Sequence, residues 1–190
     1  MERLPRLTKA ELNEEQLDLH RLITSGPRAS GPRLVELEDA QGALNGPFGV
    51  MLHVPALGGP LQELGAAVRF RTRMTDRTRE IAILAVANAT GSEFERYAHE
   101  RIGRAAGLTE TELSALRDGT FTSADPTEAT AYALCRRLLD VDPRQPCSDE
   151  EYAAAVEVLS PAGILELTVL VGYYRTLAQL MSVFAIGAPG

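Results

Sequence analysis

The feature that most restricts the fold of this chain is an almost unbroken apolar run over residues 81–90. In a helix, Ile83, Leu84 and Val86 would lie on several different faces, so this segment has no polar side to turn toward water. We therefore expect a central helix over about residues 77–89, buried nearly all round by the elements that pack about it.

Helix-start signals recur along the chain, whereas strand signals do not. Capping boxes, in which a Ser or Thr is followed three residues later by Glu, occur at residues 109–112 and 148–151, and Pro126 occupies a first helical position. The sequence therefore predicts an all-α fold. Besides the central helix, we expect a helix capped by Asn13, a short one at 51–54, helices over 61–71, 93–106 and 110–119, helices that begin near 126 and 149, and a last, longest one over 162–186.

The chain has 190 residues, 45% of them hydrophobic, which is sufficient for one domain with a hydrophobic core. We expect a single domain, in which residues 1–44 form an N-terminal helix and a Gly/Pro-rich connection and residues 45–187 form the helical core. The connection, over residues 25–49, is long for a compact domain, so we expect it to be functional, to contact another subunit or to be mobile.

Charge and cysteine content exclude several kinds of protein. A net charge of −7 is unfavourable for binding nucleic acid, which relies on neutralised phosphates. The last apolar segment contains Glu166 and Arg175, which favours a buried soluble helix over a membrane span. Cys135 and Cys147 have neither C-x-x-C nor metal-site spacing, so we expect free thiols in a reducing cytoplasm and no metal site.

Two carboxylates and an imidazole are predicted to come together around the stretch GSEFERYAHE, residues 91–100. Glu95 and His99 are four residues apart on one helix face, and a carboxylate beside an imidazole raises its basicity and fixes its tautomer. If the helices on either side of Gly91 pack as a hairpin, Glu80 approaches the same place, and three titratable groups in an apolar pocket suit a general acid or base. The alternative is an ordinary exposed Glu–His pair, with Glu80 paired to a neighbouring Arg.

Four further residues are candidates for binding a substrate. Arg69 and Arg79 belong to a dense basic stretch and could hold a carboxylate with two hydrogen bonds. His53 and Tyr174 lie among apolar residues, where such side chains are more often hydrogen-bonded members of the core. A further histidine, His20, is expected at the surface of the first helix.

Three segments resemble the carboxymuconolactone decarboxylase family, which belongs to the alkylhydroperoxidase D-like superfamily. They are GPFGVMLHVPALGGPLQELGAAVRF, MTDRTREIAILAVANATGSEFERYAHERIGRAAGLTETELSAL and VGYYRTLAQLMSVF, and they extend from about Asn45 to Phe184. The resemblance implies an alkylhydroperoxidase D-like helical bundle with a central helical hairpin, assembled as trimers or hexamers.

The resemblance also implies which residues act. Peroxidases of this superfamily have a redox C-x-x-C, a His four residues after the second Cys, and a Glu on the preceding helix. Glu80 and His99 fall on the last two positions, whereas Ser92 and Glu95 stand where the two cysteines would be. Because a thiol peroxidase needs a thiolate and a second, resolving thiol, we expect no such activity.

The resemblance thus favours a cofactor-independent enzyme that decarboxylates or isomerises a small lactone or unsaturated carboxylic acid. In this interpretation His99 donates the proton, Glu95 orients it, and Glu80 moves protons or holds a second carboxyl group. Two alternatives stay open. One is a non-catalytic, ligand-binding helical oligomer, and the other is an atypical peroxidase-related protein that uses Cys135 or Cys147.

Overall fold

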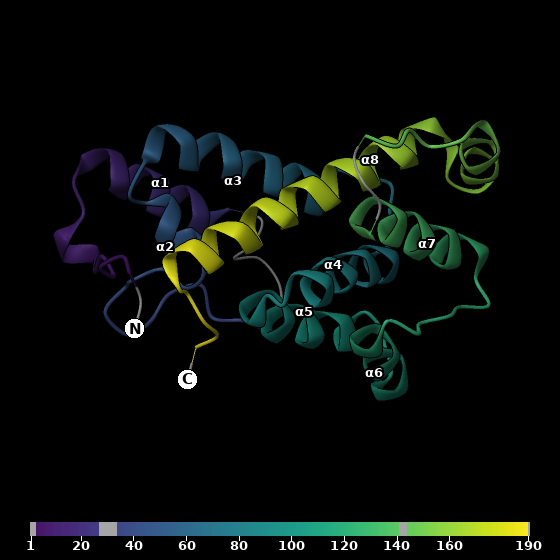
Figure 1. Ribbon diagram of the computed structural model, residues 1–190. Helices are drawn as coiled ribbons and strands as arrows, with labels where there is room; N and C mark the ends of the chain where they lie inside the picture. Colours follow the sequence, from purple (N-terminus) through teal and green to yellow (C-terminus); the bar gives the residue numbers. More distant parts are fainter. Residues whose placement is uncertain (1–2, 27–33, 141–143, 190) are drawn as a thin grey trace.

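The computed structural model describes residues 3–26, 34–140 and 144–189, and the regular elements in these ranges are helices, as the sequence predicted (Figure 1). In chain order they are a 3-10 turn η1 (Lys9–Glu11) and helices α1 (Glu14–Ser25), α2 (Pro47–Met51), α3 (Pro55–Phe70), α4 (Asp76–Thr90), α5 (Glu93–Ala105), α6 (Glu110–Asp118), α7 (Pro126–Asp140) and α8 (Asp149–Phe184). Within these ranges β pairing is limited to an isolated bridge between Glu38 and Leu44.

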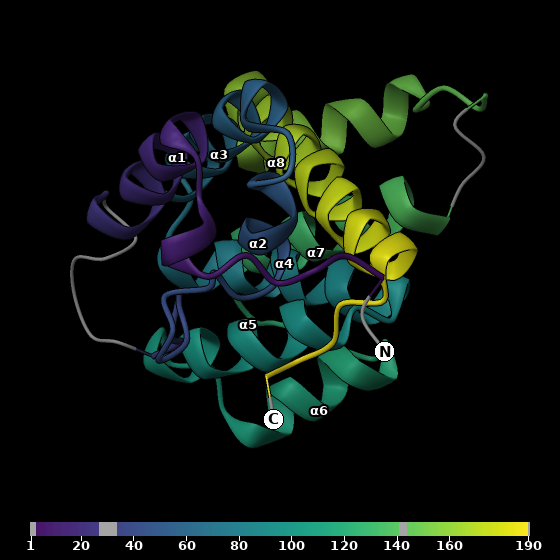
Figure 2. The same cartoon turned by 90° about the vertical axis from the view of Figure 1, so that its left-hand side faces the viewer.

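Helix α4 lies in the middle of the molecule, with α5, α6, α7 and α8 packed around it (Figure 1 and Figure 2). Every residue from Thr78 to Ala87 is buried. Thr75 caps the start of the helix by accepting a hydrogen bond from the Thr78 N–H at 3.1 Å. The expected central helix is therefore confirmed, and its surroundings are other helices.

Helices α4 and α5 form a hairpin that turns at Gly91. This residue has φ +66°, a left-handed conformation that glycine adopts at little cost, and its N–H donates to the last carbonyls of α4. The Ser92 N–H donates back to the Ala87 carbonyl at 2.9 Å. The hairpin brings Glu80 on α4 beside His99 on α5.

Two of the expected helix boundaries near residue 55 are wrong. Helix α2 ends at Met51, and α3 begins at Pro55, so Pro60 lies inside α3 instead of at its start. An internal proline removes one hydrogen bond to the carbonyl four residues earlier. That carbonyl belongs to Ala56, which is exposed, so water can replace the lost donor.

The helices expected to begin near residue 149 and at residue 162 are both present, and α8 joins them end to end across a kink at Ser160. Ser160 has φ +63° and ψ +162°, and Pro161 follows it. This backbone region is favourable only for glycine and costs other residues on the order of 1–3 kcal/mol. The kink is therefore a strained position within α8.

Replacement of Ser160 by Gly is expected to raise the free energy of unfolding by about 1 kcal/mol, because glycine adopts this conformation without strain. The weak contact that Ser160 Oγ accepts from the Gly163 N–H, at 3.4 Å, is lost at the same time. Urea unfolding measures the change. Ser182→Gly, at an exposed helical position of α8, is the matched control and should destabilise by about 1 kcal/mol. Equal losses in both variants would show that the kink stores no strain.

His20 is buried, so the expectation of a surface histidine is wrong. Its side chain is 1% exposed, and Nε2 donates to the Gly42 carbonyl at 3.0 Å and lies 3.3 Å from Glu38 Oε2. The connection folds back over α1 in a turn in which the Asp39 carboxylate accepts hydrogen bonds from the N–H groups of residues 41 and 43. Residues 27–33 of the same connection lie outside the described ranges, so its expected role stays a prediction.

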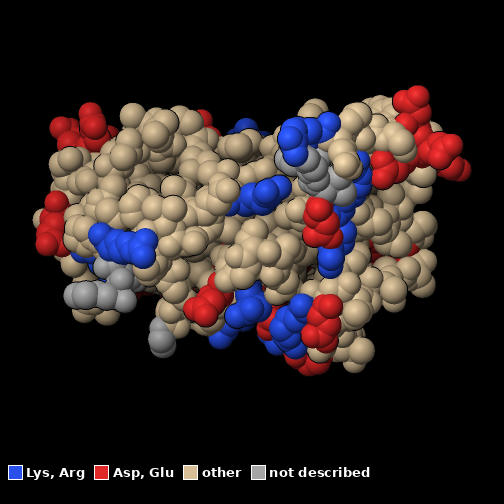
Figure 3. All heavy atoms as spheres, viewed as in Figure 1, with Lys and Arg blue, Asp and Glu red and all other residues tan. Residues whose placement is uncertain are grey.

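Helix α8 is long and apolar enough to cross a membrane, since an 18-residue window in it has a mean hydropathy of 1.7. Core helices of soluble proteins meet the same criterion. Helix α8 packs against α4 and α7 and buries Leu167, Leu170 and Leu177, but only 22% of the apolar window is buried, less than in a typical core helix. One helix of this kind is weak evidence for a membrane span. The outer side of α8 leaves Leu165 exposed, and Figure 3 shows wide uncharged areas between the charged groups that gather at the start of α8 and along the lower edge.

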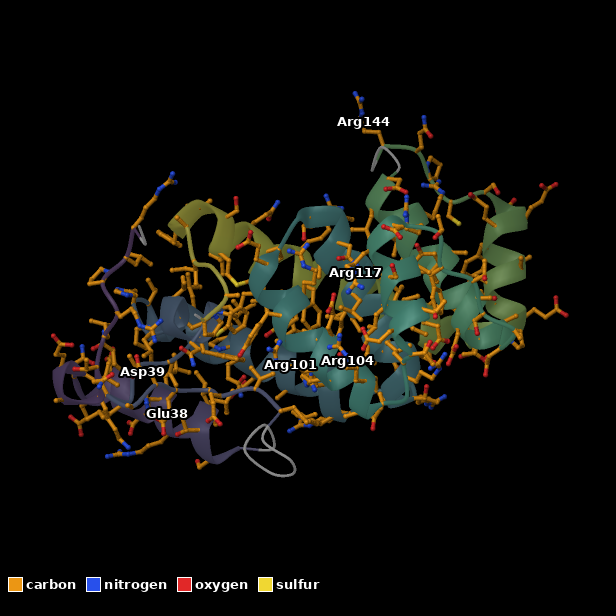
Figure 4. The ribbon with its side chains drawn as sticks, turned by 90° about the horizontal axis from the view of Figure 1, so that it is seen from below. Glu38, Asp39, Arg101, Arg104, Arg117 and Arg144 are labelled. Atoms are coloured by element: carbon orange, nitrogen blue, oxygen red, sulfur yellow. The ribbon has the colours of Figure 1, made fainter. Side chains whose placement is uncertain are left out.

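Ion pairs join α5 to α6 on the outside of the hairpin. Arg104 lies 3.5 Å from Glu100 and 2.5 Å from Glu110, and Arg117 lies 2.6 Å from Glu100. Figure 4 shows Arg104 and Arg117 close together on this surface. Because these groups are exposed or half-buried, each pair contributes only about 0–1 kcal/mol.

Candidate active site

A buried histidine held between two carboxylates forms the centre of the candidate site. His99 Nδ1 lies 2.6 Å from Glu80 Oε2, and His99 Nε2 lies 3.2 Å from Glu95 Oε2. All three residues are buried, with 1% of Glu80, 3% of Glu95 and 5% of His99 exposed. The structure thus brings together the three residues that the sequence predicted as a group, with α4 supplying one carboxylate and α5 the other.

Two further side chains enclose this centre, one from α3 and one from α8. Arg69 Nη1 lies 3.6 Å from Glu80 Oε1, and its guanidinium also hydrogen-bonds the Tyr174 hydroxyl. The Tyr174 ring meets the His99 ring edge-on, with centroids 5.3 Å apart and an interplanar angle of 89°. Arg69 is therefore occupied by Glu80 and Tyr174 within the described structure.

The charges of the cluster favour the protonated histidine. Complete burial by itself lowers the pKa of His99, but the Glu80 carboxylate, by charge and hydrogen bond, and the Glu95 carboxylate outweigh it. The pKa of His99 consequently lies above its ordinary value. Burial also raises the pKa of Tyr174, against the opposing effect of Arg69, so its hydroxyl remains neutral.

Two buried polar atoms at the start of α5 have no hydrogen-bond partner in the described part of the chain. They are Glu95 Oε1 and Ser92 Oγ. Ser92 is the N-cap residue of α5, yet its side chain makes no capping hydrogen bond. Sequence reasoning did not identify this hydroxyl as part of the site, although its spacing of three residues from Glu95 on one helix face could have indicated it.

The other two predicted substrate-binding residues lie outside the cluster. His53 Nε2 donates to the Pro5 carbonyl at 3.1 Å, and its side chain lines a small cavity of about 20 Å³ between the N-terminal residues and α2, roughly the space of one water molecule. Arg79 is buried and paired with Asp76. Neither residue belongs to the cluster, and a role of either one in binding a substrate stays a prediction.

Neither cysteine has the surroundings of a reactive thiol. Both are free; Cys135 is buried on α7, and Cys147 is exposed before α8. Burial raises the pKa of Cys135 to about 12, and slight burial with the nearby Glu151 raises the pKa of Cys147 above its usual value. Among the described residues, no three His, Cys, Asp or Glu side chains gather as a metal site would require.

Known structures show the same fold. A peroxidase-related protein with an alkylhydroperoxidase AhpD core, from Ralstonia eutropha JMP134, has a TM-score of 0.78 and 12% identity, over 99% of this chain and 92% of that chain. The debrominase Bmp8 has a TM-score of 0.69 and 12% identity, over 97% of this chain and 91% of that chain in its apo form. A variant of Bmp8 in complex with 2,3,4-tribromopyrrole gives the same TM-score and identity, over 97% of this chain and 90% of that chain. At such identity the likeness shows the fold alone, and no curated protein matches the chain in sequence.

The sequence itself matches one family model, that of the carboxymuconolactone decarboxylase family, over residues 55–137. The matched segment begins at the first residue of α3 and ends within α7. It contains Arg69, Glu80, Glu95 and His99, so all of the cluster except Tyr174 lies inside it. Residues 55–137 thus match the carboxymuconolactone decarboxylase family, and the fold of the chain is that of the AhpD-like proteins.

Proposed function

We propose that this protein is a cofactor-independent acid–base enzyme that decarboxylates or isomerises a small lactone or unsaturated carboxylic acid. The observation that supports the proposal is His99, buried between Glu80 and Glu95, whose carboxylates raise the pKa of the imidazole. A buried carboxylate–imidazole–carboxylate chain can hold a proton and transfer it to a bound molecule.

The cluster can supply the proton transfers that both reactions need. In decarboxylation the bond to the carboxyl carbon breaks, carbon dioxide leaves, the electron pair spreads into a conjugated carbonyl as an enolate, and a proton from the cluster is added to carbon. In isomerisation the cluster takes a proton from one carbon and returns it to another. A site closed to water favours the decarboxylation, because a delocalised enolate needs less hydration than a carboxylate.

The test is a turnover assay on purified protein, without added metal or thiol, with carboxymuconolactone and related lactone acids. Release of carbon dioxide and loss of the lactone are followed from pH 5 to pH 9. Consumption of at least one compound, equal in wild type and in the exposed control Glu93→Gln, would support an acid–base enzyme. Inertness toward the whole series would overturn the named reactions.

The second candidate function is a ligand-binding helical oligomer without catalysis. The observation that favours it is the burial of His99 and both carboxylates within the single chain. We also propose that the protein is cytoplasmic and assembles as a trimer or hexamer, with the exposed apolar side chains Leu57 and Leu64 of α3 and Leu165 of α8 as support. Sedimentation of the wild type decides the assembly, and binding of lactone acids without turnover would select this second function.

Peroxide consumption is expected to be negligible in the wild type and unchanged in the Cys135→Ser/Cys147→Ser double variant. The reason is that both thiols have a pKa above the usual range and therefore form little thiolate. Loss of hydrogen peroxide in the presence of dithiothreitol measures the activity. Peroxide consumption by the wild type that disappears in the double variant would revive the peroxidase-related alternative.

A further inference from the structure

Neither ring nitrogen of His99 is free to meet a substrate. Nδ1 faces Glu80 Oε2 at 2.6 Å, and Nε2 faces Glu95 Oε2 at 3.2 Å. The edge-on ring of Tyr174 packs against the imidazole. A substrate could touch His99 only by separating a buried carboxylate from its charged partner, which is unfavourable in a low-dielectric interior.

The atoms that do await a partner belong to Ser92 and Glu95. Glu95 is 3% exposed and Ser92 is 8% exposed, yet Glu95 Oε1 and Ser92 Oγ have no hydrogen-bond partner among the described residues. The two residues are three apart at the start of α5, so they share one helix face. An unpaired buried acceptor is costly, so a molecule that donates a hydrogen bond or a proton there is favoured.

We infer that Glu95 Oε1 is the atom that exchanges a proton with the substrate, that the Ser92 hydroxyl binds the same part of the substrate, and that His99 is a positioning residue acting through Glu95. The inference rests on the proposed acid–base function. The roles of the two residues are the reverse of those expected from the sequence, in which His99 donated the proton and Glu95 oriented His99. Oε2 of Glu95 receives the His99 hydrogen bond, while Oε1 faces the substrate.

The charge of the cluster indicates the chemical class of the substrate. The positive charges of Arg69 and protonated His99 are balanced by Glu80 and Glu95, so no cation is left over for an anion beside Glu95 Oε1. The reacting end of the substrate is therefore a neutral carbon acid, with a C–H bond next to a lactone or conjugated carbonyl. Any carboxyl group of the substrate lies at its other end.

The step that follows is an isomerisation. Glu95 Oε1 takes the proton from the acidic carbon, and the electrons of the C–H bond pass into the carbonyl as an enolate. The enolate then takes the proton back at its far carbon, so the double bond moves and Glu95 returns to a carboxylate. The His99 imidazolium, held by Glu80, stabilises the ionised form of Glu95 between turnovers.

The experiment is deuterium exchange into unsaturated γ-lactones in D₂O, followed by proton NMR over pD 5–9. The probes are muconolactone, carboxymuconolactone and the lactone without a carboxyl group. The proteins are wild type, Glu95→Gln, Glu95→Asp, His99→Gln and the exposed control Glu93→Gln. Circular dichroism confirms that each variant is folded.

We expect Glu95→Gln to lose roughly 100-fold or more in exchange rate, because Gln cannot accept the proton. Glu95→Asp should keep part of the activity, and Glu93→Gln all of it. His99→Gln should retain slow exchange whose pH profile is displaced, since the carboxylate then lacks its charged partner. Displacement of the profile distinguishes positioning from simple loss of structure. The titratable groups packed around His99 are Glu80 of α4, Glu95 of α5, Arg69 of α3 and the neutral Tyr174 of α8, and the charges of the first three set this profile.

Two results would overturn the inference in different ways. Full exchange by Glu95→Gln, with none by His99→Gln, would make His99 the direct proton donor and leave the proposed function standing. No exchange or turnover of any probe by the wild type would overturn the proposed function together with the inference.

Ser92→Ala tests the contact of the hydroxyl with the substrate. We expect KM to rise roughly 2- to 10-fold with kcat nearly unchanged, the effect of one lost hydrogen bond. The fold should tolerate the change, because Ser92 makes no capping hydrogen bond. An unchanged KM would remove Ser92 from the site.

Discussion

Substitution of His99 by Gln is expected to lower the turnover of a lactone acid by roughly 10²- to 10⁴-fold. Gln fills similar space and can donate to one carboxylate, but it carries no positive charge to stabilise the ionised form of Glu95. Glu80 and Glu95 would then face each other across a neutral group in a buried site, and the balance of charge would be lost. Initial rates from pH 5 to pH 9 measure the effect.

The pH profile of the wild type gives a second readout of the same histidine. Because the pKa of His99 lies above its ordinary value, the imidazolium persists through neutral pH and is lost only on the alkaline side. The alkaline limb of the wild-type profile should therefore lie above the ordinary titration range of histidine. His99→Gln should lack that limb. A folded variant with wild-type rates and profile would exclude His99 from the reaction.

The largest loss of stability is expected from Arg77→Met, at about 1–3 kcal/mol, because the buried Glu128 loses the charged donor of a half-buried arginine. Arg77 Nε donates to Glu128 Oε1 at 2.7 Å, Nη1 donates to the Gly107 carbonyl at 2.6 Å, and Nη2 donates to Glu112. One guanidinium thus joins α4, α6, α7 and the turn after α5. Without it, the donor left to the buried Glu128 carboxylate among the described residues is Ser123 Oγ, at 2.7 Å.

Denaturant unfolding of matched variants checks this expectation. Arg104→Met removes an exposed arginine that also pairs with two carboxylates, and it should cost less than about 1 kcal/mol. The double variant Arg77→Met/Glu128→Gln should be more stable than Arg77→Met, because the uncompensated charge is gone. Equal losses of unfolding free energy for Arg77→Met and Arg104→Met would show that the contacts of Arg77 stabilise the fold no more than those of an exposed arginine.

Acid unfolding should reveal the same network. The hydrogen bond from Arg77, together with the Thr109 N–H, lowers the pKa of Glu112 to about 2. A carboxyl group whose pKa is lower in the folded than in the unfolded chain stabilises the fold above its unfolded pKa of about 4.5. That contribution is lost as the pH falls from about 4.5 to about 2. In Arg77→Met the unfolding free energy should therefore depend less steeply on pH in this window.

Much of the fold follows from local signals in the sequence. The capping boxes at 109–112 and 148–151 and the glycine at residue 91 mark helix ends by chemistry that acts within a few residues, and the structure has helix ends at these places. The gathering of Glu80, Glu95 and His99 also follows from the sequence, since helical spacing and a tight hairpin are sufficient to place them together.

The remaining features depend on contacts between distant segments. Burial of His20 results from a connection that folds back over α1, and nothing in its own helix indicates this. The kink at Ser160 joins two helices that each look complete in the sequence. Arg69 could be placed near the site, but only the packing of α3 and α8 on α4 shows that Glu80 and Tyr174 already occupy it.

The balanced charges of the cluster have a consequence for ionic strength. Dissolved salt screens exposed charges over about 8 Å at physiological concentration, but ions cannot enter between groups that are buried and a few ångströms apart. Catalysis through Glu95 and His99 should thus be nearly constant from low to high salt, whereas surface pairs such as Arg117–Glu100 weaken. A salt series therefore separates the chemistry of the interior from the electrostatics of the surface in this protein.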